Sequence, residues 1–298
     1  MDGILNIYKE SGYTSFDVVA KLRRILNQKK IGHTGTLDPA AIGVLPVCVG
    51  KATKLCSLLT DGTKTYETVL LLGTITDTLD MEGQVIKTCP VECTNTEAER
   101  CVMSFLGEQE QIPPMYSALK VNGKRLYDLA RAGVTVERKP RKVVFYELDI
   151  LEINLPRIRL RVKCSKGTYI RSLCNDIGEA LGCGGCMEKL IRTGSGGFSI
   201  ESALTLSEVE KLMEAGGIEK ALIPVDKIFE NIPKAVTLPE FDKTVRNGGK
   251  IARAAFDSHS RSEAGKGDVR LYDSEGTFIG IYSFMPESDM FRPKKIFY

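Results

Sequence analysis

Apolar positions follow two spacings along the first two thirds of the chain, and together these predict helices combined with a sheet. Runs typical of strands occupy residues 3–8, 44–49, 65–72, 143–154 and 157–164. Helical spacing begins after Thr14 or Ser15, either of which can cap a helix carrying Val18, Val19 and Leu22 on one face. Further helices are expected over residues 52–59, 96–106, 125–132, 168–181 and 205–215.

The pattern changes near Pro233, which predicts a second, smaller domain over residues 235–298. Its expected elements are a short helix at 239–246 and a hairpin of 269–272 with 277–284, joined by a turn at 274–276. Residues 74–95 are acidic and rich in turn formers, and residues 108–142 resemble an insertion because Pro113-Pro114 interrupts any regular element.

One loop concentrates candidate chemistry. It reads Gly32-His33-Thr34-Gly35-Thr36-Leu37-Asp38-Pro39, without helical or strand periodicity, and the buried strand at 44–49 follows it. A loop that presents a single carboxylate beside a strand is a frequent place for catalysis, although an Asp-Pro turn can also be only a turn. A phosphate-binding P-loop is excluded, because Gly50-Lys51 is followed by Ala52.

Charge and composition refine this interpretation. The chain has 298 residues, and 43% of them are hydrophobic. Its net charge is only +3, so overall charge does not indicate a nucleic-acid partner. Basic residues are nevertheless clustered, with eight against two acidic ones from Lys120 to Lys142 and six against none from Arg157 to Arg171. Such blocks are either solvated faces or, with the tyrosines between them, an RNA groove.

Other function classes find little support. No stretch approaches the length of a transmembrane helix and no signal peptide is apparent, so a cytoplasmic location with nine reduced cysteines is expected. Cys183-Gly-Gly-Cys186 has the spacing of half a zinc site, but no second pair follows, and we expect no metal.

The loop, with Gly43-Val44-Leu45-Pro46 behind it, resembles the signature loop of the TruB-type tRNA pseudouridine-55 synthases. Further blocks resemble the same family in order: Gly3 to Ser15, Tyr66, Gln111 to Lys120, Cys164 to Arg171, and Leu190 with Arg192 and Thr193. The similarity spans residues 1–230. In the first block, Tyr8-Lys9-Glu10 stands where the family usually has Asp-Lys-Pro.

The resemblance implies an α+β pseudouridine synthase fold over residues 1–232, with a mixed, mainly antiparallel sheet flanked by helices. It also implies an RNA-binding thumb at about 108–142 and a PUA-like β-barrel over 235–298. The implied reaction isomerises uridine 55 in the T-arm loop of tRNA to pseudouridine, which consumes nothing and needs no cofactor. The expected partner is tRNA, with no membrane and no partner protein, and a monomer is expected.

The resemblance also assigns residues. Asp38 would be the catalytic carboxylate, Arg171 its partner, and Tyr66 would stack on the target uracil and could accept a proton late in the reaction. His33 would stack in the loop vacated by the flipped uridine. Residues expected at the bound RNA or base are Lys9, Lys64, Lys120, Lys139, Arg141, Lys166, Tyr169 and Leu190.

Alternatives remain for these assignments. Arg171 could hold a phosphate instead, and Tyr66 could be an ordinary packed strand residue. The chain could be an RNA-binding or RNA-folding protein without catalysis, although Asp38, Tyr66 and Arg171 together argue against that. It could also act in a guide-RNA complex, as archaeal and eukaryotic relatives do, but the thumb-like insertion favours an enzyme that acts alone.

Overall fold

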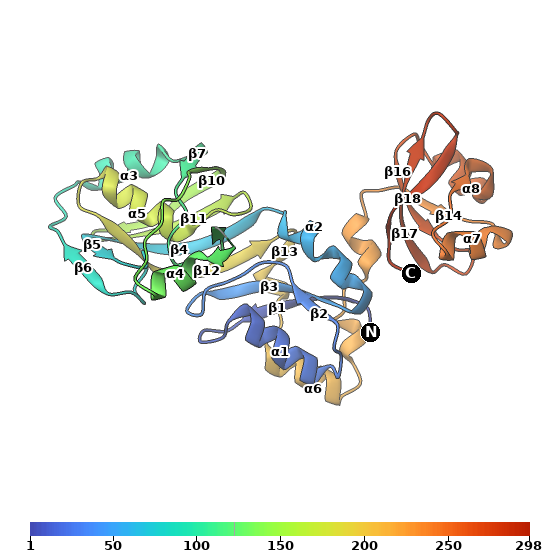
Figure 1. The fold of residues 1–298 in the computed structure, drawn as a ribbon, viewed down its shortest axis with the longest axis horizontal. Coiled ribbons are helices and arrows are strands. Elements are labelled where there is room, and N and C mark those ends of the chain that lie inside the picture. The colour runs from blue at the N-terminus through green and yellow to red at the C-terminus, as the bar shows by residue number, and fades with distance from the viewer. Residues whose placement is uncertain (122) are drawn as a thin grey trace.

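The computed structural model describes residues 1–121 and 123–298, which form a large sheet-based domain and a small C-terminal domain (Figure 1). The small domain, orange to red, lies beside the blue N-terminal part of the large one. Within the described residues, no helix has the length and apolar character that crossing a membrane would require.

A nine-stranded sheet organises the large domain. Its strands are β1 (Gly3–Lys9), β2 (Ile31–His33), β3 (Ile42–Val49), β4 (Lys64–Leu72), β7 (Gly107–Gln111), β10 (Arg141–Asn154), β11 (Arg157–Cys164), β12 (Gly185–Ser195) and β13 (Phe198–Ser199). The order is β1-β3-β12-β4-β11-β10-β7, with β2 paired to β3 and β13 to β12. Pairing is antiparallel except between β3 and β12, where Arg192 faces Gly43. The predicted mixed, mainly antiparallel sheet is confirmed.

Helices cover the two ends of this sheet separately. Helices α3 (Asn95–Met103) and α5 (Ile170–Ala180) enclose a core with β4, β10 and β11, and helices α1 (Ser15–Ile25) and α6 (Leu206–Glu214) enclose another with β1 and β3. Burial alternates along β11, so Ile158, Leu160 and Val162 face the first core. This alternation leaves the intervening side chains of β11 on the opposite, solvent-exposed face of the sheet.

Capping boxes begin three of these helices. Thr14 caps α1 with Asp17, Thr94 caps α3 with Glu97, and Thr205 caps α6 with Glu208. The structure therefore selects Thr14 over Ser15 as the cap of α1, and α6 lies within the helix predicted at 205–215. Helix α3 begins at Asn95 and ends at Met103, earlier than predicted, because the chain turns before Gly107 starts β7.

Several elements differ from the sequence-based prediction. The central strand β12 was missed because two register shifts, at Met187/Lys189 and Arg192/Gly194, break its alternation of polar and apolar residues. The acidic segment contains a hairpin, β5 (Thr74–Thr76) with β6 (Val85–Thr88). The helix expected at 52–59 is a 3-10 helix, η1 (Gly50–Leu55), followed by α2 (Cys56–Thr60).

The insertion begins and ends in the main sheet, since β7 pairs with the start of β10. Between them lie a short hairpin, β8 (Lys120–Val121) with β9 (Lys124–Arg125), and helix α4 (Leu126–Arg131). The helix predicted at 125–132 is therefore confirmed, while Asn122 lies outside the described residues.

The C-terminal domain is a curled five-stranded sheet in the order β14-β16-β17-β18-β15 (Figure 1). Its elements are β14 (Lys234–Val236), η5 (Pro239–Phe241), α7 (Asp242–Arg246), β15 (Ile251–Ala252), η6 (Arg253–Ala255), α8 (Ser258–Glu263), β16 (Asp268–Tyr272), β17 (Phe278–Met285) and β18 (Met290–Ile296). The predicted hairpin is confirmed, and the curled sheet agrees with the PUA-like barrel that the resemblance implies.

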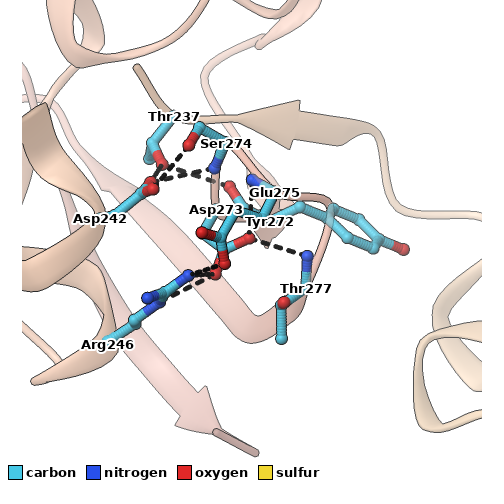
Figure 2. A network of polar contacts seen from close by, with 8 residues as sticks. All are labelled: Thr237, Asp242, Arg246, Tyr272, Asp273, Ser274, Glu275 and Thr277. Atoms are coloured by element: carbon cyan, nitrogen blue, oxygen red, sulfur yellow. Dashed lines mark hydrogen bonds and ion pairs between the residues drawn. The ribbon is translucent and has the colours of Figure 1, made fainter. Parts of the chain in front are cut away.

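A polar network fixes the turn between β16 and β17 (Figure 2). The side chain of Asp273 is fully buried, and its Oδ1 accepts hydrogen bonds from the backbone amides of Glu275 and Thr277, at 3.1 and 2.8 Å. Its Oδ2 accepts from Nε of Arg246 in α7 at 2.9 Å. Every oxygen of this buried carboxylate is thus satisfied, as burial of a charge requires.

Aromatic packing joins the two domains. Phe229 lies at the end of the 3-10 helix η4 (Val225–Phe229), and its ring centroid is 6.5 Å from that of Phe278 and 5.9 Å from that of Phe297. On the large domain, Nζ of Lys54 donates to the carbonyl of Ile296 at 2.8 Å. The C-terminal domain is therefore held directly against the large domain near η1. The remaining 3-10 helices are η2 (Ile200–Ser202) and η3 (Ile218–Lys220).

Candidate active site

A cavity of about 540 Å³ opens where the signature loop, residues 32–39, meets β4, β12 and the start of α5. This volume lies in the range of sites that enclose small ligands. The predicted site residues that line it are Asp38, Lys64, Tyr66, Arg141, Lys166, Tyr169, Arg171 and Leu190. The structure therefore gathers residues that lie more than 150 positions apart in the sequence.

Hydrogen bonds hold the signature loop on both sides of its carboxylate. On one side, the Leu37 amide donates to Oγ of Ser15 at 2.9 Å. On the other, the Pro39 carbonyl accepts from the Gly12 amide and from Nζ of Lys9, both at 3.0 Å. Asp38 lies between these two anchors, so its backbone is fixed before any substrate arrives.

Lys9 departs from the prediction that it contacts a phosphate. Its side chain is 0% exposed, and its ammonium also donates to the carbonyls of Tyr13 and Glu10, at 2.6 and 3.1 Å. Burial lowers the pKa of this ammonium to about 8. The Lys9 ammonium therefore holds the backbone around the signature loop in place, and its three hydrogen-bond donors are already occupied.

Asp38 forms an ion pair with Arg171, with 3.1 Å between Oδ2 and Nη2. The Asp38 side chain is 38% exposed through the cavity mouth, yet the protein atoms around it desolvate the carboxylate and raise its pKa. The Arg171 guanidinium acts in the opposite direction and favours the ionised form. Desolvation is the larger of the two effects, so the net shift of the Asp38 pKa is upward, and Arg171 limits that shift.

Arg171 is itself held from several sides. Its side chain is only 7% exposed, and its two terminal nitrogens donate to the carbonyls of Thr78 and Tyr116, at 3.1 and 2.9 Å. A second carboxylate, Asp80, lies 3.4 Å from Nη1. This arrangement favours the predicted pairing with Asp38 over the alternative of a free guanidinium that holds a phosphate.

Asp80 was not singled out by sequence reasoning. It belongs to the acidic, turn-rich segment, where nothing in composition separates a buried carboxylate from solvated ones. In the structure its side chain is nearly buried, and Oδ1 accepts from Thr78 Oγ1 and the Glu82 amide, at 2.6 and 3.1 Å. The loop before β6 thereby contributes the second acidic partner of Arg171.

Tyr66 lies on β4 and lines the cavity with 9% of its surface exposed. Burial raises the pKa of its phenol, and the neighbouring guanidinium of Arg192 opposes that shift. Arg192 also lines the cavity. Sequence reasoning used Arg192 only to recognise a motif and gave it no role, because neither its strand nor its burial was visible in the sequence.

Of the remaining predicted residues, Tyr169 and Lys166 line the cavity, whereas His33, Lys120 and Lys139 lie outside it. Tyr169 precedes α5, where its backbone amide donates to Oε1 of Gln111 at 2.8 Å, and Lys166 pairs with exposed Asp61 at 2.9 Å. His33 is half-buried, with Nδ1 lying 3.2 Å from the Gly35 carbonyl, and burial lowers its pKa. Lys120 and Lys139 lie in the insertion.

Lys64 lines the cavity, but its ammonium is not directed to a phosphate. Nζ donates to the carbonyls of Thr60 and Gly62, the latter at 2.6 Å, and burial lowers its pKa. Like the Lys9 ammonium, the Lys64 ammonium holds the backbone in place and differs in this from the predicted phosphate contact.

The basic strip from Arg157 to Lys163 lies on the face of the sheet opposite Tyr66. Its residues alternate with the buried side of β11, and each is paired with a carboxylate: Arg157 with Glu188, Arg159 with Glu67 and Glu152, Arg161 with Glu67, and Lys163 with Glu147. This part of the predicted RNA groove is therefore a solvated, charge-balanced face.

All nine cysteines are free thiols. Cys183 and Cys186 are both buried, and the Cys183 thiol donates to the Gly184 carbonyl at 3.4 Å. Across residues 1–121 and 123–298, no three histidine, cysteine or acidic side chains meet in an arrangement that could hold a metal ion.

Comparison with known proteins agrees with this geometry. A family model described as the N-terminal domain of TruB family pseudouridylate synthases matches residues 23–170, and one for the tRNA pseudouridylate synthase B C-terminal domain matches residues 171–230. A tRNA pseudouridine synthase B of Lachnoclostridium phytofermentans is 52% identical, and one of Clostridium kluyveri is 46% identical; each alignment covers 100% of both chains.

Among solved structures, a chain of a Cbf5-Nop10-Gar1 complex is similar with a TM-score of 0.72 and 29% identity. The alignment covers 99% of this chain and 85% of that one. The similarity therefore includes the C-terminal domain as well as the large one. From the full-length identity and the two matching family models, this chain belongs to the TruB family of pseudouridylate synthases.

Proposed function

We propose that the target of this tRNA pseudouridine synthase is uridine 55 in the T-arm loop, and that Asp38 is the carboxylate that acts on it. The observation that carries the proposal is the Asp38–Arg171 pair in the cavity that Tyr66 also lines. A fixed carboxylate, a cation that keeps it ionised and an aromatic ring suited to stack on uracil together match the needs of the isomerisation.

The reaction breaks the bond from uracil N1 to the ribose, turns the base and joins C5 to the same carbon. Asp38 serves as the nucleophile toward base or sugar, or as the base that removes a sugar proton. Tyr66 and Leu190 line the cavity that receives the uracil, with Tyr66 available to stack on it. Because the atoms of the product are those of the substrate, the reaction itself calls for no cofactor.

The uridine must leave its loop to reach this cavity, and base flipping costs a few kcal/mol. Cations at the mouth offset part of this cost by binding phosphates, and we assign that role to Arg141, Lys166, Lys120 and Lys139. Arg141 lines the cavity, while Lys120 and Lys139 lie in the insertion that we propose as the thumb, residues 108–142. His33 would stack in the opened loop, with Tyr169 contacting the RNA.

We assign catalysis to residues 1–232 and additional tRNA binding to residues 235–298. We further propose that the chain acts as a monomer in the cytoplasm, where its nine free thiols are expected to remain reduced. The alternative is dependence on a guide RNA and partner proteins. In its favour, the similar chain of the Cbf5-Nop10-Gar1 complex is found together with other proteins.

The test is to incubate purified protein with an unmodified tRNA transcript and map pseudouridine along it. We expect one modified position, uridine 55, without any added RNA or protein. A transcript with cytidine at that position should remain unmodified and serves as the control. Modification elsewhere would contradict the target, and activity only after addition of a guide RNA would favour the alternative.

A further inference from the structure

Arg192 occupies a position that its strand alone does not explain. On β12 it pairs directly with Tyr66 of β4 in the antiparallel register, and with Gly43 of β3 in the parallel one. Directly opposite residues of neighbouring strands point to the same face, with their Cβ atoms about 5 Å apart. The Arg192 side chain therefore lies beside the Tyr66 ring, and both line the same cavity.

Two of its three nitrogens have clear tasks. Nε donates to the Val44 carbonyl at 2.6 Å, and Nη1 donates to the Thr36 carbonyl in the signature loop at 3.3 Å. These bonds connect β12 to β3 and to the segment just before Asp38. They account for the arginine as a structural clamp, but they use only part of its guanidinium.

The third nitrogen is the unusual one. Nη2 is buried and has no hydrogen-bond partner within the described residues, and the whole side chain is only 1% exposed. A buried charged donor without an acceptor is costly and uncommon, so such a group calls for a functional explanation. The polar group that the strand register places on the same face is the phenol of Tyr66.

We propose that Arg192 is a positioning residue of the isomerisation: its guanidinium lies beside the Tyr66 phenol, with Nη2 left free to donate to the phenol oxygen, and thereby fixes the ring that meets the uracil. The inference rests on the proposed function and adds a residue to it. Because a guanidinium carries its charge permanently, it also favours the phenolate form of Tyr66. A purely structural clamp through Val44 and Thr36 would have neither effect on Tyr66.

Fluorine NMR can observe the effect on Tyr66 directly. Replacing Tyr66 by 3-fluorotyrosine gives one resonance, whose titration is followed in the free protein. In Arg192→Met, loss of the cation should move the midpoint upward by about one pH unit. Arg192→Lys keeps a charge and should move it less. An unchanged midpoint in folded Arg192→Met would overturn the proposal.

Kinetics provide a second, independent test. Single-turnover rates on unmodified tRNA are measured for Arg192→Met and Arg192→Lys, each in the Tyr66 and the Tyr66→Phe backgrounds. If Arg192 acts through the phenol, each change should cost about tenfold more with the hydroxyl present than without it. Equal losses in both backgrounds would overturn the proposal and leave only the clamp.

The two tests also separate this inference from the proposed function. The titration uses no RNA, so it stands even if uridine 55 proves not to be the target. If Arg192→Met fails to fold, the kinetic cycle with Arg192→Lys still decides, because it keeps the charge and most of the volume. Melting temperature and tRNA affinity of each variant establish that the protein compared is intact.

Discussion

The two faces of the main sheet differ in how their charged side chains are buried and paired. On the outer face, each basic side chain of the strip from Arg157 to Lys163 is exposed and neutralised by glutamates. On the cavity face, Arg171 is 7% exposed and is shared by Asp38 and Asp80. Exposed pairs contribute little free energy, whereas a buried charge that loses its partner is destabilising by several kcal/mol.

Clustering of basic residues along the sequence is therefore a poor guide to an RNA surface. The basic residues of the strip recur at every second position because side chains of β11 alternate between the two faces of the sheet. Glutamates on nearby strands of the sheet neutralise their charges. Arg141 and Lys142 line the cavity, and neither forms an ion pair with any residue in the described ranges. Cations without a partner remain available for phosphates, so pairing is more informative than abundance.

Among substitutions that compare the two faces, the largest expected effect comes from removing the shared cation. Arg171→Met should reduce the single-turnover rate by at least about a hundredfold, since two carboxylates lose their partner. Because the cation favours ionised Asp38, its loss raises the pKa of that carboxyl further, and the acidic limb of the pH–rate profile should move to higher pH. Rates measured across pH check both expectations.

Arg161→Met on the outer face is the matched control. The same substitution there should leave both the rate and the position of the acidic limb nearly unchanged. An equal loss of activity in the two variants would mean that the faces do not differ as described.

A smaller effect is expected on tRNA binding. Arg141→Ala should weaken affinity and reduce the slope of log K against log salt by about 1, as expected for one lost phosphate contact. Arg161→Ala should change neither, because its partner Glu67 already neutralises it. Titrations at several salt concentrations measure the slopes; a reduced slope for Arg161→Ala would place RNA on the outer face.

The smallest effect is expected for Glu67→Gln, which removes the carboxylate shared by Arg159 and Arg161. The free energy of unfolding should change by only about 0.5 kcal/mol, because the pairs are exposed and screened. Denaturant unfolding measures it. A loss of several kcal/mol would show that this face contributes to stability much as the buried pair does.

Much of the fold was predictable because its signals are local. Strands β4, β10 and β11 have apolar residues at the spacing typical of strands. Thr205 and Glu208 form a capping box that marks the start of α6. Strand β12 was not predictable in the same way. Its pairing with both β3 and β4 is a long-range property, and its register shifts remove the alternation on which a strand prediction depends.

The site was predictable only in part, for a related reason. Resemblance identified Asp38, Tyr66 and Arg171, which the structure brings to one cavity. Asp80 and Arg192 differ from other charged residues in being buried, and composition does not reveal burial. Lys9 carries the same charge whether it faces a phosphate or the three backbone carbonyls that it contacts. Whether a lysine binds a phosphate or holds the backbone in place is set by the surrounding fold.

The central claim is that Asp38 performs chemistry on bound tRNA, and Asp38→Asn tests it most directly. The amide keeps the size and much of the hydrogen bonding but cannot serve as nucleophile or base. Pseudouridine yield and tRNA affinity are measured on the same transcript, with Asp149→Asn, exposed on β10 opposite Arg161, as the matched control. We predict that Asp38→Asn abolishes turnover and retains binding, whereas near-normal yield from the folded variant would contradict the account.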